Sequence, residues 1–285
     1  MSQGLTVGIV GAGSVGQALA RLLAADFDVI VSSRSRARAA GAVAGIDARA
    51  ATLEALASSS DCVIVAVPDR AVPEVVAELA RFDLAAALQT SGALGPASLA
   101  PLRKRGVPCA MFHPLQTFPT PDAGAQRLPG SLVGVCGDDR ALAWCEGLAV
   151  ALRCTTFKVA EDQLAQYHAA AVLASNCVVG LVDAAATLME GAGVERMDAL
   201  RALRPLLDAS LENASTMEAN QALTGPIARG DAVTVRRHLG SMRNSPTALV
   251  GLYRACGEYL LNLAQRRGLS DSQATAVRSA LSEEC

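Results

Sequence analysis

The stretch Leu5-Thr6-Val7-Gly8-Ile9-Val10-Gly11-Ala12-Gly13-Ser14-Val15-Gly16 decides the fold of this chain. A short apolar run with β-branched residues ends in the spacing G-x-G-x-x-G, and residues 17–25 follow as a helix-forming stretch. This order of strand, glycine turn and helix is typical of a dinucleotide-binding fold. The alternative is an ordinary strand-to-helix turn without a ligand.

Each glycine of this motif has a physical role in such a fold. Gly11 permits the tight turn, Gly13 lets the backbone approach a pyrophosphate, and Gly16 lets the helix pack closely on the strand. The free N–H groups of the new helix would then face the phosphates. The predicted cofactor-binding residues here are Gly11, Ala12, Gly13, Ser14, Val15 and Gly16.

Length and composition limit the classes of protein that are possible. A chain of 285 residues suggests two domains at about 150 residues each. The net charge of -2 offers no basic stripe for nucleic acid.

We expect charges or glycines to break every apolar run well before the ~20 residues of a membrane helix. The N-terminus enters a strand too early for a signal peptide. We therefore expect a soluble cytoplasmic protein that binds neither nucleic acid nor membranes.

The eight cysteines form no C-x-x-C motif and no close pair. Most of them stand in apolar stretches, where a reduced cysteine behaves as a small hydrophobic residue. We expect reduced thiols in a reducing compartment and no structural metal.

Strand and helix patterns alternate up to residue 160, which predicts a doubly wound parallel α/β sheet, a Rossmann domain over residues 1–160. The predicted strands cover residues 5–10, 27–33, 61–69, 85–90, 107–112, 131–136 and 155–159, the last at an edge. The predicted helices cover residues 17–25, 52–59, 73–81, 96–105 and 140–152.

The strand signal stops near residue 161, and residues 161–285 are predicted to form an all-helical domain for substrate binding and dimerisation. The predicted helices cover residues 163–189, 196–214, 231–242, 246–267 and 271–284. Their alanine-rich faces suggest a homodimer formed through this domain.

The second predicted strand ends in Ser32-Ser33-Arg34-Ser35-Arg36, where an NAD site usually has an acidic residue. Hydroxyl and guanidinium groups suit a 2′-phosphate, so Ser33 and Arg34 favour NADP over NAD. The alternative is a solvated loop with surface arginines. Val67 and Pro68, which end the third predicted strand, are expected to line the nicotinamide-ribose side.

Ser91 and His113 each follow a predicted parallel strand, at the edge where the reactive end of the cofactor should lie. A histidine can transfer a proton while hydride arrives, and a hydroxyl can hold the substrate oxygen. The alternatives are a turn residue before Gly92 and an imidazole that caps backbone before Pro114.

His168, Val172 and Ser175 share one face of the long helix 163–189, and Asn176 flanks them. Polar side chains on an apolar helix are costly to bury without partners, so they bond at a domain seam or face the substrate. We favour the second, with His168 and Asn176 as catalytic residues and Ser175 as a substrate-binding residue.

The glycine-proline turn of residues 222–231 separates two predicted helices, and Asp231 is expected to cap the second. Thr224 and Arg229 are candidates to bind a substrate carboxylate. The alternative is a stiff structural turn.

Together these segments resemble a family of Rossmann-like oxidoreductases that have an N-terminal NADP-binding domain and a helical C-terminal domain. The resemblance covers essentially the whole chain, and some members are proposed to act as an alternative ketopantoate reductase. More distantly the chain is similar to ketopantoate reductase, pyrroline-5-carboxylate reductase, deazaflavin-dependent NADP reductases and prephenate dehydrogenase. The segments that carry the resemblance are the glycine motif and residues 66–69, 90–92, 112–116, 167–176 and 223–231.

The relatives imply different site residues. Prephenate dehydrogenases place a catalytic His-Pro after the corresponding strand and a serine one strand earlier, as in His113-Pro114 and Ser91. Ketopantoate reductases carry a lysine and two asparagines where this chain has His168, Val172 and Asn176, which is a departure. The substrate loop of the pyrroline-carboxylate enzymes is not visible.

The resemblance implies an NADPH-dependent reductase of a small 2-oxo acid, with ketopantoate as the first candidate. His113 or His168 would supply the proton, while Ser91 and Asn176 orient the carbonyl group. The alternatives are an imine or cyclohexadienyl substrate, or a non-catalytic module that binds NADP as a sensor.

Overall fold

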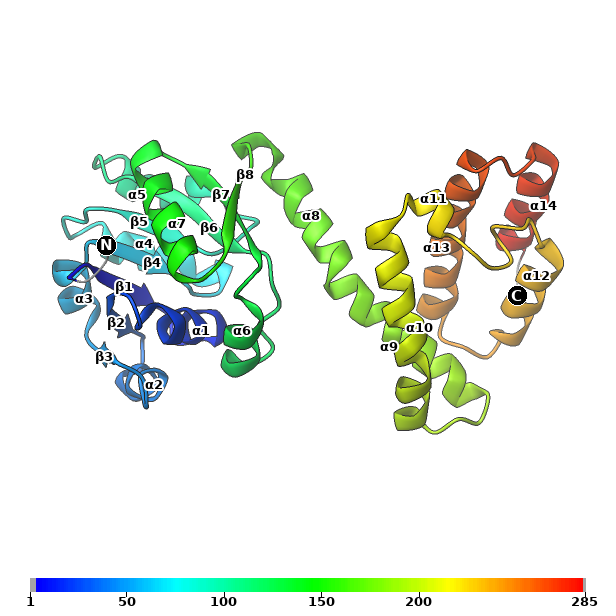
Figure 1. Cartoon of the computed structure of the whole chain (residues 1–285), viewed down its shortest axis with the longest axis horizontal. Coiled ribbons are helices and arrows are strands. Elements are labelled where there is room, and N and C mark those ends of the chain that lie inside the picture. The colour runs from blue at the N-terminus through cyan, green and yellow to red at the C-terminus, as the bar shows by residue number, and fades with distance from the viewer. Residues whose placement is uncertain (1–3, 284–285) are drawn as a thin grey trace. The chain divides into compact units, whose positions relative to one another are not determined.

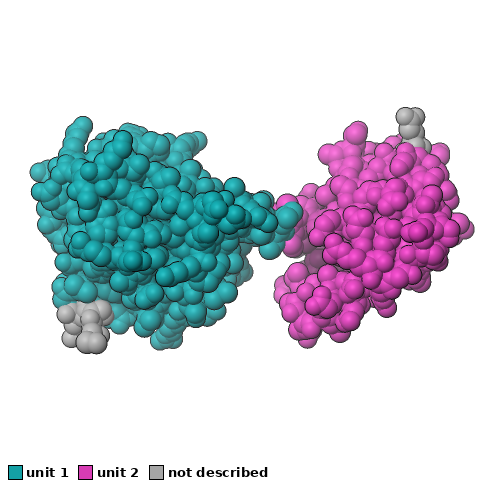
Figure 2. Space-filling view, turned by 90° about the horizontal axis from the view of Figure 1, so that it is seen from above, with its two compact units in different colours: residues 1–175 teal, residues 176–285 magenta. Residues whose placement is uncertain are grey.

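The computed structural model describes residues 4–283 and divides the chain into two compact units, residues 1–175 and 176–285 (Figures 1 and 2). The sequence places the change of domain after residue 160. The last strand does end at Lys158, and helix α8 (Leu164–Ala174) lies between the two positions. The division into a Rossmann domain of residues 1–160 and a helical domain of residues 161–285 stays a prediction.

The first unit contains an eight-stranded sheet in the order β3-β2-β1-β4-β5-β6-β7-β8. The first six strands in this order are parallel, and their arrangement is that of doubly wound dinucleotide-binding sheets. The predicted α/β class is therefore confirmed. The strands are β1 (Thr6–Val10), β2 (Asp28–Ser32), β3 (Ala48–Ala50), β4 (Cys62–Val65), β5 (Ala87–Gln89), β6 (Cys109–Pro114), β7 (Leu132–Gly137) and β8 (Thr155–Lys158).

The predicted parallel sheet needs a correction at one edge only: β7 pairs antiparallel with β6, and β8 pairs parallel with β7. The N–H of Leu115 donates to the carbonyl oxygen of Leu132 at 3.0 Å, so the chain re-enters the sheet where it left. The intervening helix α6 (Pro121–Arg127) packs beside α1 (Ser14–Leu23). At a rise of about 1.5 Å per residue, α6 is too short to return the chain to the amino ends of the strands, as a parallel connection would require.

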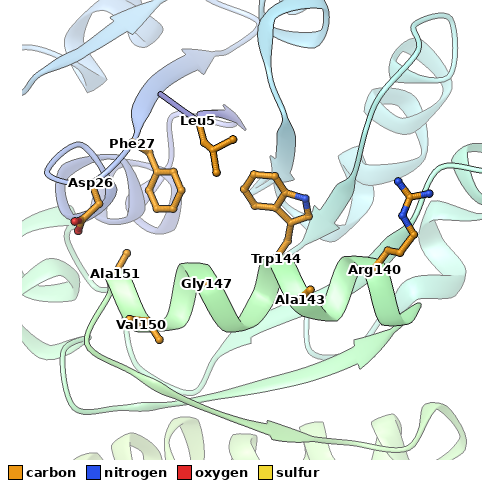
Figure 3. A pocket seen from close by; sticks show the side chains of 9 residues that line it. All are labelled: Leu5, Asp26, Phe27, Arg140, Ala143, Trp144, Gly147, Val150 and Ala151. Carbon is orange, nitrogen blue, oxygen red and sulfur yellow. The ribbon is translucent and has the colours of Figure 1, made fainter. Parts of the chain in front are cut away.

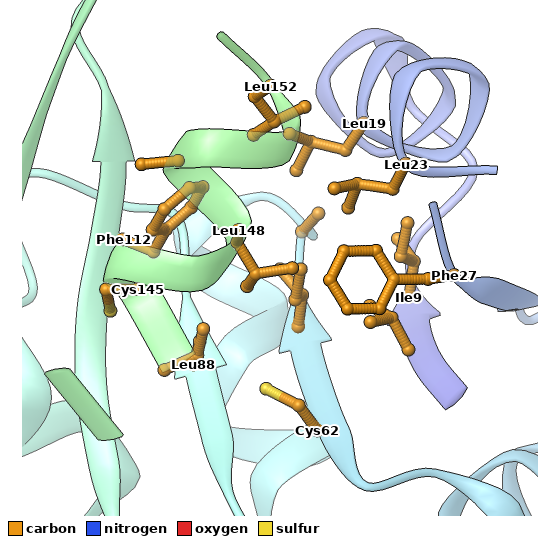
Figure 4. Close-up of a cluster of buried hydrophobic side chains, with 14 of the residues drawn as sticks. Ile9, Leu19, Leu23, Phe27, Cys62, Leu88, Phe112, Cys145, Leu148 and Leu152 are labelled. Carbon is orange, nitrogen blue, oxygen red and sulfur yellow. The ribbon is translucent and has the colours of Figure 1, made fainter. Parts of the chain in front are cut away.

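Two apolar cores cover the two faces of the sheet, because successive residues of a strand point to opposite faces. On one face, Leu19 and Leu23 of α1 and Leu148 of α7 (Asp139–Ala151) pack over Ile9 (Figure 4). The other face is covered by α3 (Leu53–Ser59), α4 (Val72–Leu79) and α5 (Ala100–Arg103). The carboxyl edge of the strands is left to the connecting loops.

The second unit is helical, as predicted, and its core lies between α12, α13 and α14. Asp231 caps α12, accepting from the N–H of Thr234 at 3.0 Å, which confirms the predicted cap. The helices are α9 (Asn176–Gly191), α10 (Arg196–Thr216), α11 (Ala219–Ala222), α12 (Ala232–Ser241), α13 (Thr247–Arg266) and α14 (Asp271–Ser282).

The predicted single helix over residues 163–189 is interrupted. A 3₁₀ turn (Glu161–Gln163) leads into α8, and Ser175 leaves the helical conformation with φ -125° and ψ -74° before α9 begins. The Ser175 hydroxyl donates to the carbonyl oxygen of Ala171 at 2.6 Å, a bond back by four residues that bends helices.

In the described part of the chain, the stretch Glu161–Gly191 is long and apolar enough to cross a membrane, by length and composition alone. Residues 164–182 contain no Asp, Glu, Lys or Arg. The prediction that every apolar run is broken well before this length is therefore wrong here.

Candidate active site at the carboxyl edge of the sheet

The glycine turn after β1 has the close contacts that its sequence predicted. Gly11 has a φ of +128°, and a Cβ there would collide with the carbonyl oxygen of Ala66. A Cβ on Gly16 would collide with the carbonyl oxygen of Gly11. The side chain of Val67 borders the same turn, 3.2 Å from where that Gly11 Cβ would lie. Only glycine fits at these two positions of the turn.

Gly13 has a different environment, because nothing lies within 4 Å of the position that a Cβ would take. It is the N-cap residue of α1, and no side chain caps this helix. The first N–H groups of a helix have no partner within the helix and carry a partial positive charge. The open space at Gly13, at the start of α1, therefore suits the approach of a pyrophosphate to these N–H groups.

The end of β2 carries the groups predicted to select the cofactor. Ser33 is half-buried and Arg34 is exposed. Ser35 caps the unpredicted helix α2 (Arg36–Ala42), accepting from the N–H of Arg38 at 3.3 Å. Within residues 4–283, Arg34 has no acidic side chain at ion-pair distance. Its charge remains available to a phosphate.

His113 lies near the carboxyl end of β6, within the strand rather than after it. Its ring is packed on Gly92, where a Cβ would come within 2.8 Å of the ring's Cε1. The loop that carries Gly92 is fixed by Gln89, a fully buried side chain that donates to the carbonyl oxygens of Ser91 and Gly95 at 2.9 and 3.0 Å. Because Gly92 has no side chain, the His113 ring can pack directly against its backbone.

The Ser91 hydroxyl accepts from the N–H groups of Ala93 and Leu94, both at 3.3 Å. These bonds shape the turn, which is the alternative role that the sequence left open for this serine. A substrate contact by Ser91 stays a prediction.

Tyr167 of α8 is the site residue that sequence reasoning missed. Its hydroxyl lies 2.5 Å from Nδ1 of His113, and the two rings meet edge to face with centroids 5.5 Å apart. Gly134 of β7 stands opposite His113 in the strand pairing, and a Cβ there would lie 2.5 Å from the Tyr167 oxygen. Phe157 of β8 also meets the Tyr167 ring edge to face, with ring centroids 5.8 Å apart.

His168, the next residue of α8, lies beside this pair. The centroid of its ring is 5.9 Å from that of His113. Its Nδ1 is buried, and within residues 4–283 it has no hydrogen-bond partner. A buried unsatisfied nitrogen costs about 1–3 kcal/mol, which a ligand or water would recover.

The ionisation of these groups follows from their burial. Burial, followed by the nearby His168, lowers the pKa of His113 to about 4, while Asp69 acts in the opposite direction. Burial raises the pKa of Tyr167 to about 12. At neutral pH both side chains are therefore uncharged, and the pair can hold a proton without carrying a charge.

The remaining predicted site residues lie elsewhere. Ser175 ends the first unit and Asn176 begins α9. Thr224 and Arg229 lie in the second unit, where they line a cavity of about 570 Å³ together with Arg267 and other residues around the turn between α13 and α14. The structure thus brings together His113, His168 and the Ser91 loop within one unit, and their catalytic roles stay predictions.

A second hollow, of about 530 Å³, lies along α7 (Figure 3). Its lining includes Leu5 and Phe27, which precede β1 and β2, and Trp144 of α7. It is therefore at the amino edge of the sheet, away from the glycine turn and His113.

Comparisons with known proteins agree with this geometry. Residues 6–88 match the family model described as NADP oxidoreductase coenzyme F420-dependent, and residues 131–260 match a domain of unknown function, DUF2520. No curated protein matches the chain.

Solved structures share the fold over nearly the whole chain. Protein TM1727 from Thermotoga maritima is 24% identical with a TM-score of 0.71, covering 92% of this chain and 99% of its own. A reductive aminase from Aspergillus terreus, solved with NADPH, is 18% identical with a TM-score of 0.66, covering 96% and 99%. Pyrroline carboxylate reductase from Plasmodium falciparum, solved with NADP, is 13% identical with a TM-score of 0.61, covering 99% and 100%.

The fold, the open glycine turn and the family match define the class of Rossmann-like NADP oxidoreductases, which confirms the predicted resemblance. Within that class, residues 6–88 of this protein match the NADP oxidoreductase model, and residues 131–260, which run from β7 into α13, match DUF2520.

Proposed function

We propose that the protein uses NADPH to reduce the carbonyl group of a small 2-oxo acid, with ketopantoate as the first substrate to test. The observation that carries this proposal is the open space at Gly13, where α1 begins, on the same sheet edge as the His113–Tyr167 pair. Three strand spacings of about 4.8 Å separate β1 from β6. A dinucleotide that lies across the carboxyl ends of the strands would extend from one to the other.

The residues of the chain would divide the work as follows. Gly13, Ser14 and Val15 hold the pyrophosphate, and Arg34 binds the 2′-phosphate. NADPH, when bound, supplies the hydride. The uncharged His113 ring would donate a hydrogen bond to the substrate oxygen, on which negative charge develops during reduction, and the proton that completes the alcohol would come from water. The ring of His168 lies beside that of His113, so its Nδ1 is a second group that could bond the substrate.

The decisive experiment follows NADPH absorbance with a panel of 2-oxo acids, cyclic imines and cyclohexadienyl acids. We expect turnover with a small 2-oxo acid. Turnover with imines alone would show that the substrate class is wrong, while the proposed site would stand. Tight NADPH binding without turnover on any of them would favour the sensor alternative.

An imine is the second candidate, because the pyrroline carboxylate reductase and the reductive aminase share this fold. Both candidates suit a carboxylate-bearing substrate. Thr224, Arg229 and Arg267 line a cavity of the helical unit, and arginine side chains are suited to bind a carboxylate. Substrate binding by Thr224 and Arg229 and by Ser175, and carbonyl orientation by Asn176, stay parts of this proposal.

We expect Arg34→Ala to weaken NADPH more than NADH. The guanidinium group is exposed and unpaired with acidic groups in the described residues, so its loss removes one charge-assisted bond to the 2′-phosphate. Such a bond contributes about 1.5–3 kcal/mol, or roughly 10- to 150-fold in affinity. Calorimetric titration with both nucleotides measures the ratio, and an unchanged ratio would contradict the role of Arg34.

We also propose that the helical unit forms a homodimer. Apolar side chains are exposed on α9 and α10, among them Val179, Leu181 and Leu206. The same two helices are joined by ion pairs of Arg196 with Asp183 and Glu190, which a lipid surface would not accommodate. A second copy of the chain can cover the apolar positions and leave the ion pairs at the rim. Light scattering should give twice the mass of the chain, and a monomer at micromolar concentration would overturn the dimer.

A cytoplasmic location is part of the proposal. The seven cysteines within the described residues are free thiols, which suits a reducing compartment.

A further inference from the structure

The contact between Tyr167 and His113 bears on how the proposed reaction would be promoted. We propose that Tyr167 is a positioning residue whose hydroxyl donates to Nδ1 of His113 and keeps the ring proton on Nε2, the nitrogen left to face a substrate. This inference rests on the proposed function for the role of Nε2, whereas the state of the ring itself can be measured without any substrate.

The direction of the hydrogen bond follows from the number of protons available. A neutral phenol has one proton, and a neutral imidazole has one donor and one acceptor nitrogen. If Nδ1 donated to Tyr167, the hydroxyl proton would need another acceptor, and the hydroxyl makes no second hydrogen bond among residues 4–283. Donation from the hydroxyl to Nδ1 satisfies both groups, which places the ring proton on Nε2.

Four elements hold the pair in this geometry. β6 carries His113, α8 carries Tyr167, and the bare backbone of Gly134 on β7 gives the hydroxyl room to reach the ring. Phe157 of β8 supports the Tyr167 ring from the side. Leu164 begins α8 in the apolar cluster with Met111 and Cys136, which anchors this helix on the sheet. The tyrosine is therefore held by packing as well as by its hydrogen bond.

The chain contains a second pair of the same kind, which serves as a control. The Tyr253 hydroxyl lies 2.8 Å from Nδ1 of His238, with ring centroids 5.9 Å apart. Both residues belong to the helical unit, on α13 and α12. Tyr253→Phe removes the same chemical contact in a place to which no catalytic role is assigned.

The test is nitrogen NMR of the histidine rings in the full-length protein without substrate, with three histidines to assign. We expect wild-type His113 to show a bare Nδ1 and a protonated Nε2 from pH 6 to pH 8. Tyr167→Phe should shift the His113 Nδ1 resonance and mix the tautomers, whereas Tyr253→Phe should change only His238.

The kinetic counterpart uses the substrate found in the panel. Loss of a neutral hydrogen bond of about 0.5–1.5 kcal/mol predicts a kcat about 2- to 13-fold lower in Tyr167→Phe, with unchanged NADPH affinity. A protonated Nδ1 in the wild type overturns the proposal even if the variant does not fold. A His113 spectrum unaffected by Tyr167→Phe also overturns it. If the His113 spectra are as expected but no substrate of the panel is turned over, the result counts against the proposed function and not against the role of Tyr167.

Discussion

Gly13→Val should abolish tight NADPH binding and leave the protein folded. Gly13 has an extended backbone, φ -83° and ψ -178°, that any residue can adopt, and a Cβ there meets nothing within 4 Å. The new side chain would fill the space that a pyrophosphate needs. Loss of two charge-assisted hydrogen bonds at about 1.5–3 kcal/mol each predicts a Kd at least about 100-fold higher.

Calorimetry with NADPH measures this change, and thermal unfolding checks the fold. Gly147→Val on α7 is the matched control, because its Cβ also meets nothing within 4 Å and lies far along the chain from the turn. Gly11→Val would be uninformative, since a Cβ there collides with Ala66 and would disturb the fold itself. If Gly13→Val binds NADPH with wild-type affinity, the pyrophosphate does not bind at Gly13.

Local patterns were sufficient to predict the part of the fold that surrounds the cofactor turn. The glycine spacing, the β-branched run before it and the alternation of strands with helices all depend on residues close in sequence. The reversal at β7 could not be predicted in this way. It depends on the edge at which the chain re-enters the sheet, which is determined by the packing of α6 beside α1 and by pairing between Leu115 and Leu132.

The site shows the same distinction. His113 and Ser91 were found because each lies at a strand end, where parallel sheets bind ligands. Tyr167 was missed because its contact requires the antiparallel register that brings Gly134 opposite His113. Its one sequence signal was its place beside His168 in a segment already singled out. The short elements α2, β3, α6 and α11 were also missed, since three to seven residues give too little periodicity.

His113→Ala should lower kcat/KM by about a hundred- to a thousand-fold, the usual loss when one hydrogen-bond donor to a developing oxyanion is removed. The matched control is His238→Ala, which removes a histidine that also pairs with a tyrosine but lies in the helical unit. Because Gly92 and Tyr167 both pack on the His113 ring, thermal unfolding should be recorded for each variant. Unchanged turnover in a folded His113→Ala would leave His168 as the remaining candidate.

The pH dependence of the wild type separates two ways in which His113 can act. Its pKa is lowered to about 4 by burial and by His168, with Asp69 opposing, so the ring is neutral above that value. A neutral donor predicts that kcat/KM shows no His113 titration between pH 5 and pH 8, because the ring changes its charge only near pH 4. An imidazolium acid with an ordinary pKa would instead make activity fall as the pH rises through about 6.5. If kcat/KM of the wild type falls near pH 6.5 and that of His113→Gln does not, the charged His113 ring is the active form. The neutral His113–Tyr167 pair would then not be the form that acts.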